Sequence, residues 1–409
     1  MLNALWIGFI VLSFVLACAK FLFLGDGEIF GRLMAALFDN AKTAFEISLG
    51  LTGVMALWLG IMKVGEKAGF IDLLARLMAP LFRRLFPDVP DGHPALGAIT
   101  LNMAANMLGL DNAATPLGIK AMKELQSLNR TPDTASDAQI LFLVINTASV
   151  TLLPVTIFTY RAQLGAANPT DVFIPLLLTS FGGTLIGLLA TAMYQRIRLF
   201  DPVTLIYLGG MSAAIGGLAW YFSGLPAAAM QQQSALLGHF ILLSVVTLFV
   251  GGAAWRRVNA YEAFVEGAKE GFQTAVTIIP YLVAMLVAIG LFRASGALEM
   301  LMDAVRHLVA QAGFDTRFID ALPTALMKPF SGSGARAMTI DTMKALGADS
   351  FAGRLASILQ GSTETTFYVL AVYFGAAGVK RARHAVACGL IADVGGFAVA
   401  IAVAYWFFA

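Results

Sequence analysis

Nine stretches of the sequence run for about twenty residues each with few or no charged side chains. They cover residues 2–24, 44–62, 138–162, 171–195, 203–222, 236–255, 273–292, 351–376 and 384–408. An α-helix needs about 20 mostly apolar residues to cross a bilayer. In lipid the backbone must satisfy its own hydrogen bonds, so only α-helices and closed β-barrels can cross a membrane. The alternating ten-residue pattern of a β-barrel is missing from this sequence. We therefore predict an all-α integral membrane protein with about nine transmembrane helices.

Composition agrees with a lipid environment and excludes several functions. The chain is 58% hydrophobic and 13% charged, whereas soluble domains have roughly 45–50% apolar and 25% charged residues. The net charge is only +2, and no basic segment carries interleaved aromatic residues, so no nucleic-acid partner is expected. Cys18 and Cys388 lie in apolar runs without the spacing of a metal or redox pair, so we expect no bound cofactor.

Short basic clusters orient the predicted spans. Cytoplasmic loops carry an excess of Lys and Arg, and three such clusters occur between spans: 196–198, 256–257 and 380–383. The uncharged loop 223–235 then lies outside the cell. Counting from these loops predicts a cytoplasmic N-terminus and an external C-terminus.

The sequence contains a hidden tandem repeat. "AKTAF" (41–45) recurs as "AKEGF" (268–272), and "INTASVT" (145–151) aligns with "LQGSTET" (359–365). Each copy also has an amphipathic stretch, near 70–86 and 298–311, that is predicted to lie at the membrane interface. We divide the chain into repeats 1–200 and 201–409. An odd number of crossings separates the copies, which predicts an inverted-topology repeat typical of secondary transporters.

Two stretches, 93–125 and 318–346, are too polar to cross the membrane and are predicted to be re-entrant hairpins. Thr115 before Pro116 has the chemistry of a helix cap followed by a first-turn proline. At the second tip, Ser331, Gly332, Ser333 and Gly334 are predicted to offer free backbone donors ahead of the helical segment "ARAMTIDTMKAL", which begins at residue 335. Both second arms would point positive helix ends at a polar or anionic group near the membrane midplane. Asp111 and Asn112 are equally well explained as turn formers or as ligands.

Polar residues interrupt the spans that follow each hairpin. They are Asn146, Thr147, Ser149 and Thr151 in the first copy, and Gln360, Ser362, Thr363, Glu364 and Thr365 in the second. A carboxylate at bilayer depth costs roughly 2.5 kcal/mol or more, so Glu364 should face a wet pocket or a partner. The alternative is a structural ion pair between Glu364 and Lys328 or Arg336. Asn102 and Asn106 either line the pocket or bind a neighbouring backbone.

The motifs resemble a known family. "NMLGLDNAATPLGIKAMKEL" and "MKPFSGSGARAMT" with "GSTETT" are similar to the bacterial spore maturation proteins A and B, respectively, joined here in one chain. Those proteins belong to the nucleoside-recognition (Gate) group, whose wider relatives include concentrative nucleoside transporters. The resemblance implies an elevator-like carrier of the bacterial inner membrane, in which hairpin tips and broken helices enclose the substrate. By the same resemblance Asn112, the tip 331–334, Thr363 and Glu364 would contact substrate; the first repeat has Val150 in place of Glu364.

The leading functional prediction is a secondary-active carrier for a small polar solute, with a nucleoside-like solute implied by the resemblance, and a homo-oligomeric assembly. Sodium would bind tip carbonyls and Asn or Ser oxygens, whereas proton coupling would need Glu364. The second prediction is a non-transporting membrane protein that binds a ligand or scaffolds envelope or spore maturation. An enzyme is not expected, because no nucleophile, base and orienting group occur together near Glu364.

Overall fold

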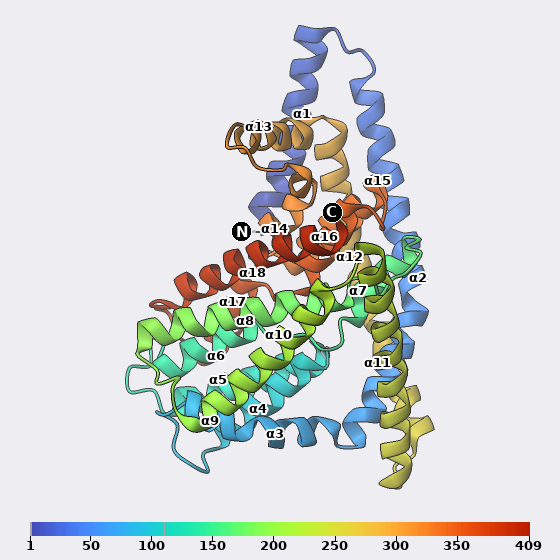
Figure 1. Ribbon diagram of the computed structural model, residues 1–409. Coiled ribbons are helices and arrows are strands. Elements are labelled where there is room, and N and C mark those ends of the chain that lie inside the picture. The colour runs from blue at the N-terminus through green and yellow to red at the C-terminus, as the bar shows by residue number, and fades with distance from the viewer. Residues whose placement is uncertain (1, 110) are drawn as a thin grey trace.

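The computed structural model describes residues 2–109 and 111–409, apart from the side chains of residues 2 and 111–113. The described chain is helical throughout and contains no β-strand (Figure 1). In chain order, the elements are α1 (Leu2–Leu24), α2 (Ile29–Lys67), α3 (Phe70–Leu85), α4 (Pro94–Met107), α5 (Asp111–Ser127), α6 (Asp137–Thr147), α7 (Val155–Gln163), α8 (Phe173–Gln195), α9 (Pro202–Thr204), the π-helix η1 (Leu205–Gly209), α10 (Gly210–Ser223), α11 (Ala227–Trp255), α12 (Ala260–Ala294), α13 (Ala297–Gln311), the 3-10 helix η2 (Arg317–Ala321), α14 (Leu322–Met327), α15 (Gly332–Leu346), α16 (Phe351–Gly361), α17 (Thr366–Ala377) and α18 (Ala385–Phe408).

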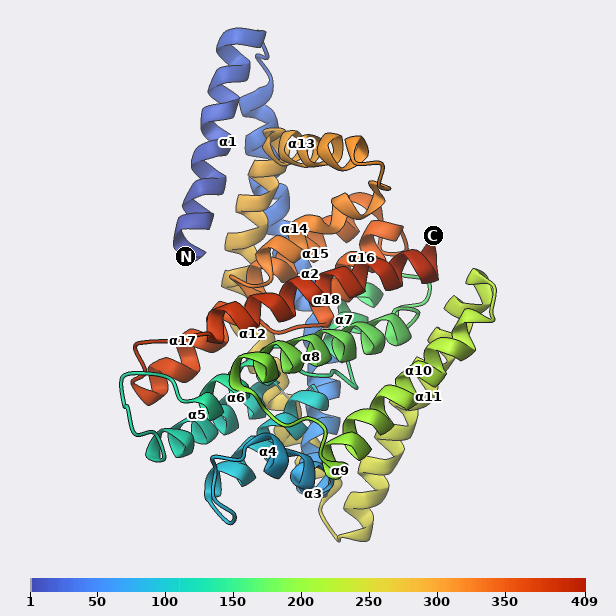
Figure 2. The same ribbon diagram turned by 60° about the vertical axis from the view of Figure 1, so that its left-hand side comes forward.

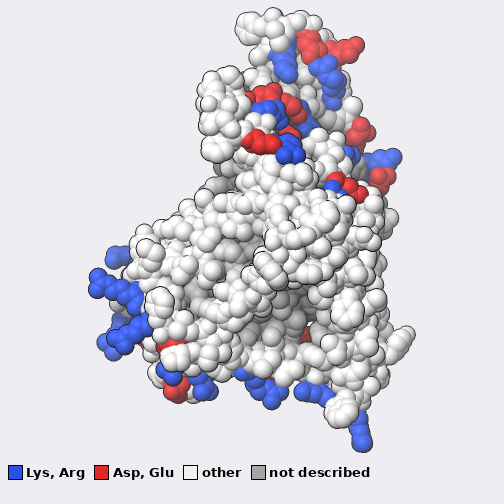
Figure 3. Space-filling model, viewed as in Figure 1, with Lys and Arg blue, Asp and Glu red and all other residues white. Residues whose placement is uncertain are grey.

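Seven helical stretches in the described residues are long and apolar enough to cross a membrane. They are α1, α2, α8, the stretch from α9 to α10, α11, α12 and α18. Charged side chains gather at the margins of the face shown in Figure 3 and leave a broad uncharged area between them. The chain is a multi-pass membrane protein, as the sequence predicts.

The two other predicted spans are each interrupted in the middle. Residues 138–162 form α6 and α7, which are separated by the non-helical segment 148–154. Residues 351–376 form α16 and α17, separated by 362–365. The polar residues of both repeats lie at these breaks, where the side chains compete with the backbone for hydrogen bonds and the helix does not continue.

Helices α2 and α12 form the longest helix pair and lie side by side in both views (Figures 1 and 2). They contain 39 and 35 residues, so both extend well beyond the predicted spans 44–62 and 273–292. Ion pairs at one end continue the pair past its apolar part, with Lys63 Nζ 3.5 Å from Glu270. Small residues let the backbones approach: a Cβ added to Gly271 would lie 2.7 Å from Ala56 Cα.

The same succession of elements occurs twice. A long helix (α2 or α12) leads through a glycine with positive φ, Gly69 at 77° or Gly296 at 82°, into an amphipathic helix (α3 or α13). A helix pair follows (α4 with α5, or α14 with α15), then a broken helix and a closing long helix (α8 or α18). Figure 1 shows α3 and α13 running across the direction of α2, as helices lying along a membrane surface would.

The two closing helices pack against each other and hold the breaks. Figure 2 shows α8 alongside α18, and the two make close contact where Gly183 meets Gly396. The methyl group of Thr363, in the second break, lies beside both glycines. The apolar helices α8 and α18 cross the pair α2 and α12, and the two polar breaks lie at the centre of the fold (Figures 1 and 2).

Candidate functional site

The two helix breaks touch each other directly. The amide of Glu364 in the second break donates to the carbonyl of Thr147, at the end of α6, at 2.7 Å. The two residues are far apart in the sequence, so this bond ties the two broken helices together at one point. The polar segments that the sequence places in separate spans are thus neighbours in the fold.

Each break is also fastened to a hairpin tip in the same way. The amide of Leu152 donates to the carbonyl of Met107 at 2.9 Å. The amide of Phe367 donates to the carbonyl of Pro329, also at 2.9 Å. Met107 ends the first arm of the α4–α5 pair, and Pro329 follows the first arm of the α14–α15 pair. Each tip is therefore held against the broken helix of its own repeat.

A cavity of about 110 Å³ lies where these elements meet. Its lining comes from α4, from the two broken helices and from the α14–α15 pair, and includes Asn106, Thr151, Lys328, Gly332, Arg336, Gln360, Thr363 and Glu364. Five of the residues predicted to line the pocket therefore line one cavity: Thr151, Gly332, Gln360, Thr363 and Glu364.

Three buried polar atoms in the wall of this cavity have no hydrogen-bond partner among the described residues. They are Arg336 Nε, Gln360 Oε1 and Thr363 Oγ1. Buried polar groups are nearly always paired in folded proteins, and leaving one unpaired costs about 1–3 kcal/mol. Three such atoms around one small space indicate a place for water or for a polar ligand.

The charged residues of the cavity do not form the structural ion pair considered for Glu364. Lys328 is 3% exposed, and its Nζ donates to the carbonyl of Gln360 at 2.6 Å. Arg336 places its guanidinium carbon 5.7 Å from the centre of the Tyr160 ring. Glu364 is an exposed residue on the wall and makes no ion pair with any residue the structure describes.

The second hairpin tip has helix-start chemistry, but α15 begins at Gly332, three residues before the predicted start, so Gly332, Ser333 and Gly334 lie in its first turn. Ser331 caps α15, since its Oγ accepts from the amide of Gly334 at 2.9 Å and lies 3.2 Å from Ser333 Oγ. The cap is buried, and Gly332 faces the cavity, where a Cβ would lie 2.9 Å from Thr365 Oγ1. Ser331, Ser333 and Gly334 thus shape the tip without lining the cavity.

The prediction of the helix start at the first tip was wrong. Helix α5 begins at Asp111, so Thr115 is inside the helix rather than its cap, and Pro116 is an internal proline. Pro116 cannot donate to the carbonyl four residues earlier, so α5 continues past it with one backbone hydrogen bond fewer. The side chains of Asp111 and Asn112 lie outside the described residues, so their predicted role stays a prediction.

Three other predicted residues are buried beside the cavity and bind the protein itself. Thr147 Oγ1 donates to the carbonyl of Val144 at 2.9 Å, and Ser362 Oγ to that of Leu359 at 3.4 Å. Asn146 belongs to an asparagine network: its Oδ1 accepts from Asn106 Nδ2 at 3.3 Å, and its Nδ2 donates to Asn102 Oδ1.

This network answers the question left open for the other two asparagines. Asn102 Nδ2 donates to the carbonyl of Ala114 at 2.7 Å, so it binds a neighbouring backbone and joins the two arms of the first hairpin. Asn106 lines the cavity as well as bonding Asn146. Both alternatives are therefore realised, one by each residue.

Sequence reasoning missed a buried acidic residue near the site. Asp393 of α18 is 1% exposed and accepts a hydrogen bond from Thr366 Oγ1, at the start of α17, at 2.7 Å. A lone carboxylate within 24 otherwise uncharged residues is the signal that would have found it, because ionisable groups inside membrane spans are rare.

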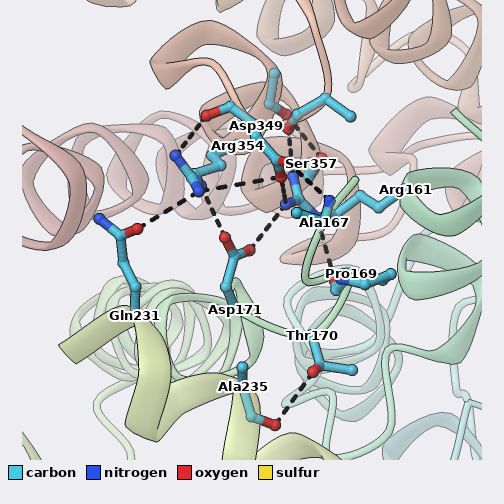
Figure 4. Close-up of polar contacts among 12 residues, drawn as sticks. Arg161, Ala167, Pro169, Thr170, Asp171, Gln231, Ala235, Asp349, Arg354 and Ser357 are labelled. Atoms are coloured by element: carbon cyan, nitrogen blue, oxygen red, sulfur yellow. Dashed lines mark hydrogen bonds and ion pairs between the residues drawn. The ribbon is translucent and has the colours of Figure 1, made fainter. Parts of the chain in front are cut away.

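It also missed the largest buried charge cluster, which we call the Arg161 cluster: Arg161, Asp171, Asp349 and Arg354 (Figure 4). Arg161, at the end of α7, is fully buried and lies 2.8 Å from Asp171 and 3.0 Å from Asp349. It also donates to the carbonyls of Pro169 and Ala348. The cluster joins the loop between α7 and α8 to the loop between α15 and α16.

A second charge cluster joins another two loops of the two repeats. We call it the Arg383 cluster: Asp133, Asp137, Lys380 and Arg383. Arg383 lies 2.7 Å from Asp137, and the amides of Lys380 and Arg381 donate to the carbonyl of Asp133 at 3.0 and 2.9 Å. It links the loop between α17 and α18 to the loop between α5 and α6. Its charged side chains are 40–77% exposed, in contrast to the buried Arg161 cluster.

Comparisons with known proteins fall on these same elements. Residues 48–164 and 275–380 match the family model described as nucleoside recognition (Gate), and these ranges contain both hairpins and both broken helices. Spore maturation protein A of Bacillus subtilis (strain 168) is 40% identical over 180 residues, which are 44% of this chain and 88% of that protein. Spore maturation protein B of the same organism is 44% identical over 169 residues, 40% of this chain and 93% of that protein.

Proposed function

Because the chain belongs to the nucleoside-recognition (Gate) family, we propose that it is a secondary-active carrier that binds a small polar solute in the cavity between its two broken helices. The observation that carries the proposal is the wall of that cavity, where three buried polar atoms have no partner among the described residues. A protein that only packed these helices together would have paired those atoms or replaced them by apolar groups.

The arrangement also supports alternating access. The chain would cross the bacterial inner membrane nine times if both broken helices span it, with the helix pairs α4–α5 and α14–α15 as re-entrant hairpins from opposite sides. The two copies would then be inverted, and rocking of one against the other would open the cavity to each side in turn. In keeping with this proposal, non-helical backbone at membrane depth is tolerated where it lines a cavity.

Coupling would use the same site. Backbone carbonyls of the breaks together with Asn106 and Thr151 offer the oxygen ligands that sodium prefers. Glu364 is the wall residue that could carry a proton. A carrier that uses Glu364 in this way should lose the pH dependence of its cavity opening in Glu364→Gln.

A test that needs no known substrate is cysteine accessibility. Cys18 and Cys388 are first replaced by alanine, and Thr363→Cys is introduced in the cavity wall. Membrane-impermeant thiol reagents are then applied to right-side-out and to inside-out vesicles. A carrier exposes the thiol of Thr363→Cys to each side in turn, so both preparations label, whereas Ser357→Cys, which is buried in α16 away from the cavity, stays unlabelled in both.

Labelling from one side only would refute alternating access. It would favour the non-transporting alternative, a membrane protein that binds a ligand or scaffolds envelope or spore maturation; the two relatives are named as spore maturation proteins. The Glu364→Gln variant is measured in the same assay across pH 5.5–8. An unchanged pH profile in that variant would remove Glu364 from the coupling mechanism and leave the carrier itself standing.

A further inference from the structure

We infer that the solute held in the central cavity carries an anionic oxygen group, a carboxylate or a phosphate, which binds to Arg336 and the start of α15. The inference rests on the proposed function in taking this cavity as the binding site. It differs from the neutral solute that a nucleoside-recognition family would suggest. Four observations support it.

The first is the charge of the wall. Among the described residues that line the cavity, the ionisable ones are Lys328, Arg336 and Glu364, and Arg336 forms no ion pair with another described residue. A guanidinium without a carboxylate partner on the wall of a small cavity attracts an anion, because little water is present there to screen its charge. Glu364 stands within the same wall and leaves room for a positive or hydrogen-bond-donating group on the same solute.

The second is the position of Arg336. It lies in the second turn of α15, which begins at Gly332, and helix N-termini carry a partial positive charge. Arg336 adds a full positive charge close to this helix start. Its buried Nε has no hydrogen-bond partner among the described residues. A bound anion would give this nitrogen a partner, since a guanidinium pairs with carboxylate and phosphate through two parallel hydrogen bonds.

The third is the state of the α15 backbone. In the first turn, the amides of Gly334 and Ala335 are satisfied by the side chain and the carbonyl of Ser331. The amides of Gly332 and Ser333 have no acceptor among the described residues. Free amides at a helix start are a common binding place for anions.

The fourth is the opposite wall, which selects the rest of the solute. Gln360 is 8% exposed and Thr363 5% exposed, and the unpaired Oε1 of Gln360 accepts hydrogen bonds but cannot donate. Together with Glu364 it requires a donor, such as a hydroxyl or an ammonium group. At about 110 Å³ the cavity is smaller than the roughly 300–1,000 Å³ of usual small-molecule sites, so a solute of few atoms fits it best.

Three probes that share one carbon skeleton test the inference: glycerol, glycerate and glycerol 3-phosphate. Each is added to the purified full-length protein in detergent at constant ionic strength, and thermal unfolding is followed against concentration. We expect a saturable rise in Tm with glycerate, with glycerol 3-phosphate or with both. Glycerol, which lacks the anionic group, and uridine, as the neutral nucleoside, should give none. The arm that responds distinguishes a carboxylate site from a phosphate site.

Variants then place the anion at Arg336. Arg336→Gln should weaken binding of the responding anion at least ~10-fold, since hydrogen bonds to charged groups are the strongest of their kind. Arg336→Lys retains the charge and should keep part of the affinity. Arg130→Gln, an exposed loop position, should bind like the unaltered protein. Arg336→Lys and size-exclusion profiles show whether a loss in Arg336→Gln reflects the missing group rather than misfolding.

Equal or stronger stabilisation by glycerol or uridine would overturn the inference, as would unchanged anion affinity in Arg336→Gln. Failure of the proposed carrier gives a different pattern. Anion binding at Arg336 together with cysteine labelling from one side only would leave a binding protein with the inferred specificity. Labelling from both sides with a response to uridine alone would leave a carrier without it.

Discussion

Replacing Arg161 by methionine should lower the free energy of unfolding by about 3 kcal/mol. Arg161 is fully buried and Asp171 is 2% exposed, so the substitution leaves a buried carboxylate with one partner fewer. Breaking a buried pair by removing one member costs about 3–5 kcal/mol. The lower end applies here, because Arg354 still lies 2.8 Å from Asp171, and Asp349 is 36% exposed and can turn to water.

The measurement is unfolding in mixed micelles, by titration with a denaturing detergent. Arg317→Met is the matched control, since Arg317 also pairs with an aspartate, at 2.9 Å, but is 51% exposed. An exposed pair of this kind contributes about 0–1 kcal/mol. Asp349→Asn should also lower the free energy of unfolding by no more than about 1 kcal/mol, because the Asp349 carboxylate is 36% exposed and reaches water. A double-mutant cycle of Arg161→Met with Asp171→Asn should give a coupling of roughly 1.5–3 kcal/mol.

The reasoning is refuted if Arg161→Met and Arg317→Met cost the same within about 0.5 kcal/mol. That result would mean that the buried guanidinium gains no more from its carboxylates than it loses by leaving water, as happens when apolar residues replace a buried ion pair without loss.

Two further predictions concern packing and pH. Gly271→Leu should lower the free energy of unfolding by about 1–3 kcal/mol, because the added Cβ would lie 2.7 Å from the backbone of α2. Gly251 in α11 has nothing within 4 Å of an added Cβ, so Gly251→Leu should change that free energy by no more than about 0.5 kcal/mol. Both variants are measured by the same detergent titration. Burial and then the charge of Arg383 lower the pKa of His384 below its usual 6.5. Protonation therefore opposes folding, so stability should be full above pH 6.5 and fall as the pH drops toward the lower folded-state pKa, and His384→Gln should flatten that decline between pH 7.5 and 5.5.

The sequence was sufficient for the helical membrane fold and for the place of the polar centre. Apolar runs of helical length predict seven of the spans, because lipid gives the backbone no other choice. The polar runs around Asn146 and Gln360 mark both breaks, since a polar segment at membrane depth needs a cavity or a partner. Ser331 indicates the start of α15 by its own capping chemistry.

What sequence reasoning missed depends on contacts between distant residues. Arg161 reads as a basic residue at a span end, and only the fold brings Asp349, 188 positions away, to 3.0 Å. The amide of Glu364 finds the carbonyl of Thr147 in the same way. The prediction for Thr115 failed for a local reason: a polar residue before proline does occur at helix starts, but α5 begins at Asp111 and continues past Pro116 without the hydrogen bond that proline cannot donate.

The Arg161 cluster is buried and the Arg383 cluster is exposed, so the loop contacts that the Arg383 cluster makes should break first. Ions in solution screen exposed charges over about 8 Å at physiological ionic strength, so rising salt weakens the contacts of Arg383. The same ions do not reach Arg161. By the predicted topology the Arg383 cluster faces the cytoplasm. In the proposed carrier, the ionic strength inside the cell would therefore weaken the loop contacts on that side and leave the Arg161 cluster on the outer side intact.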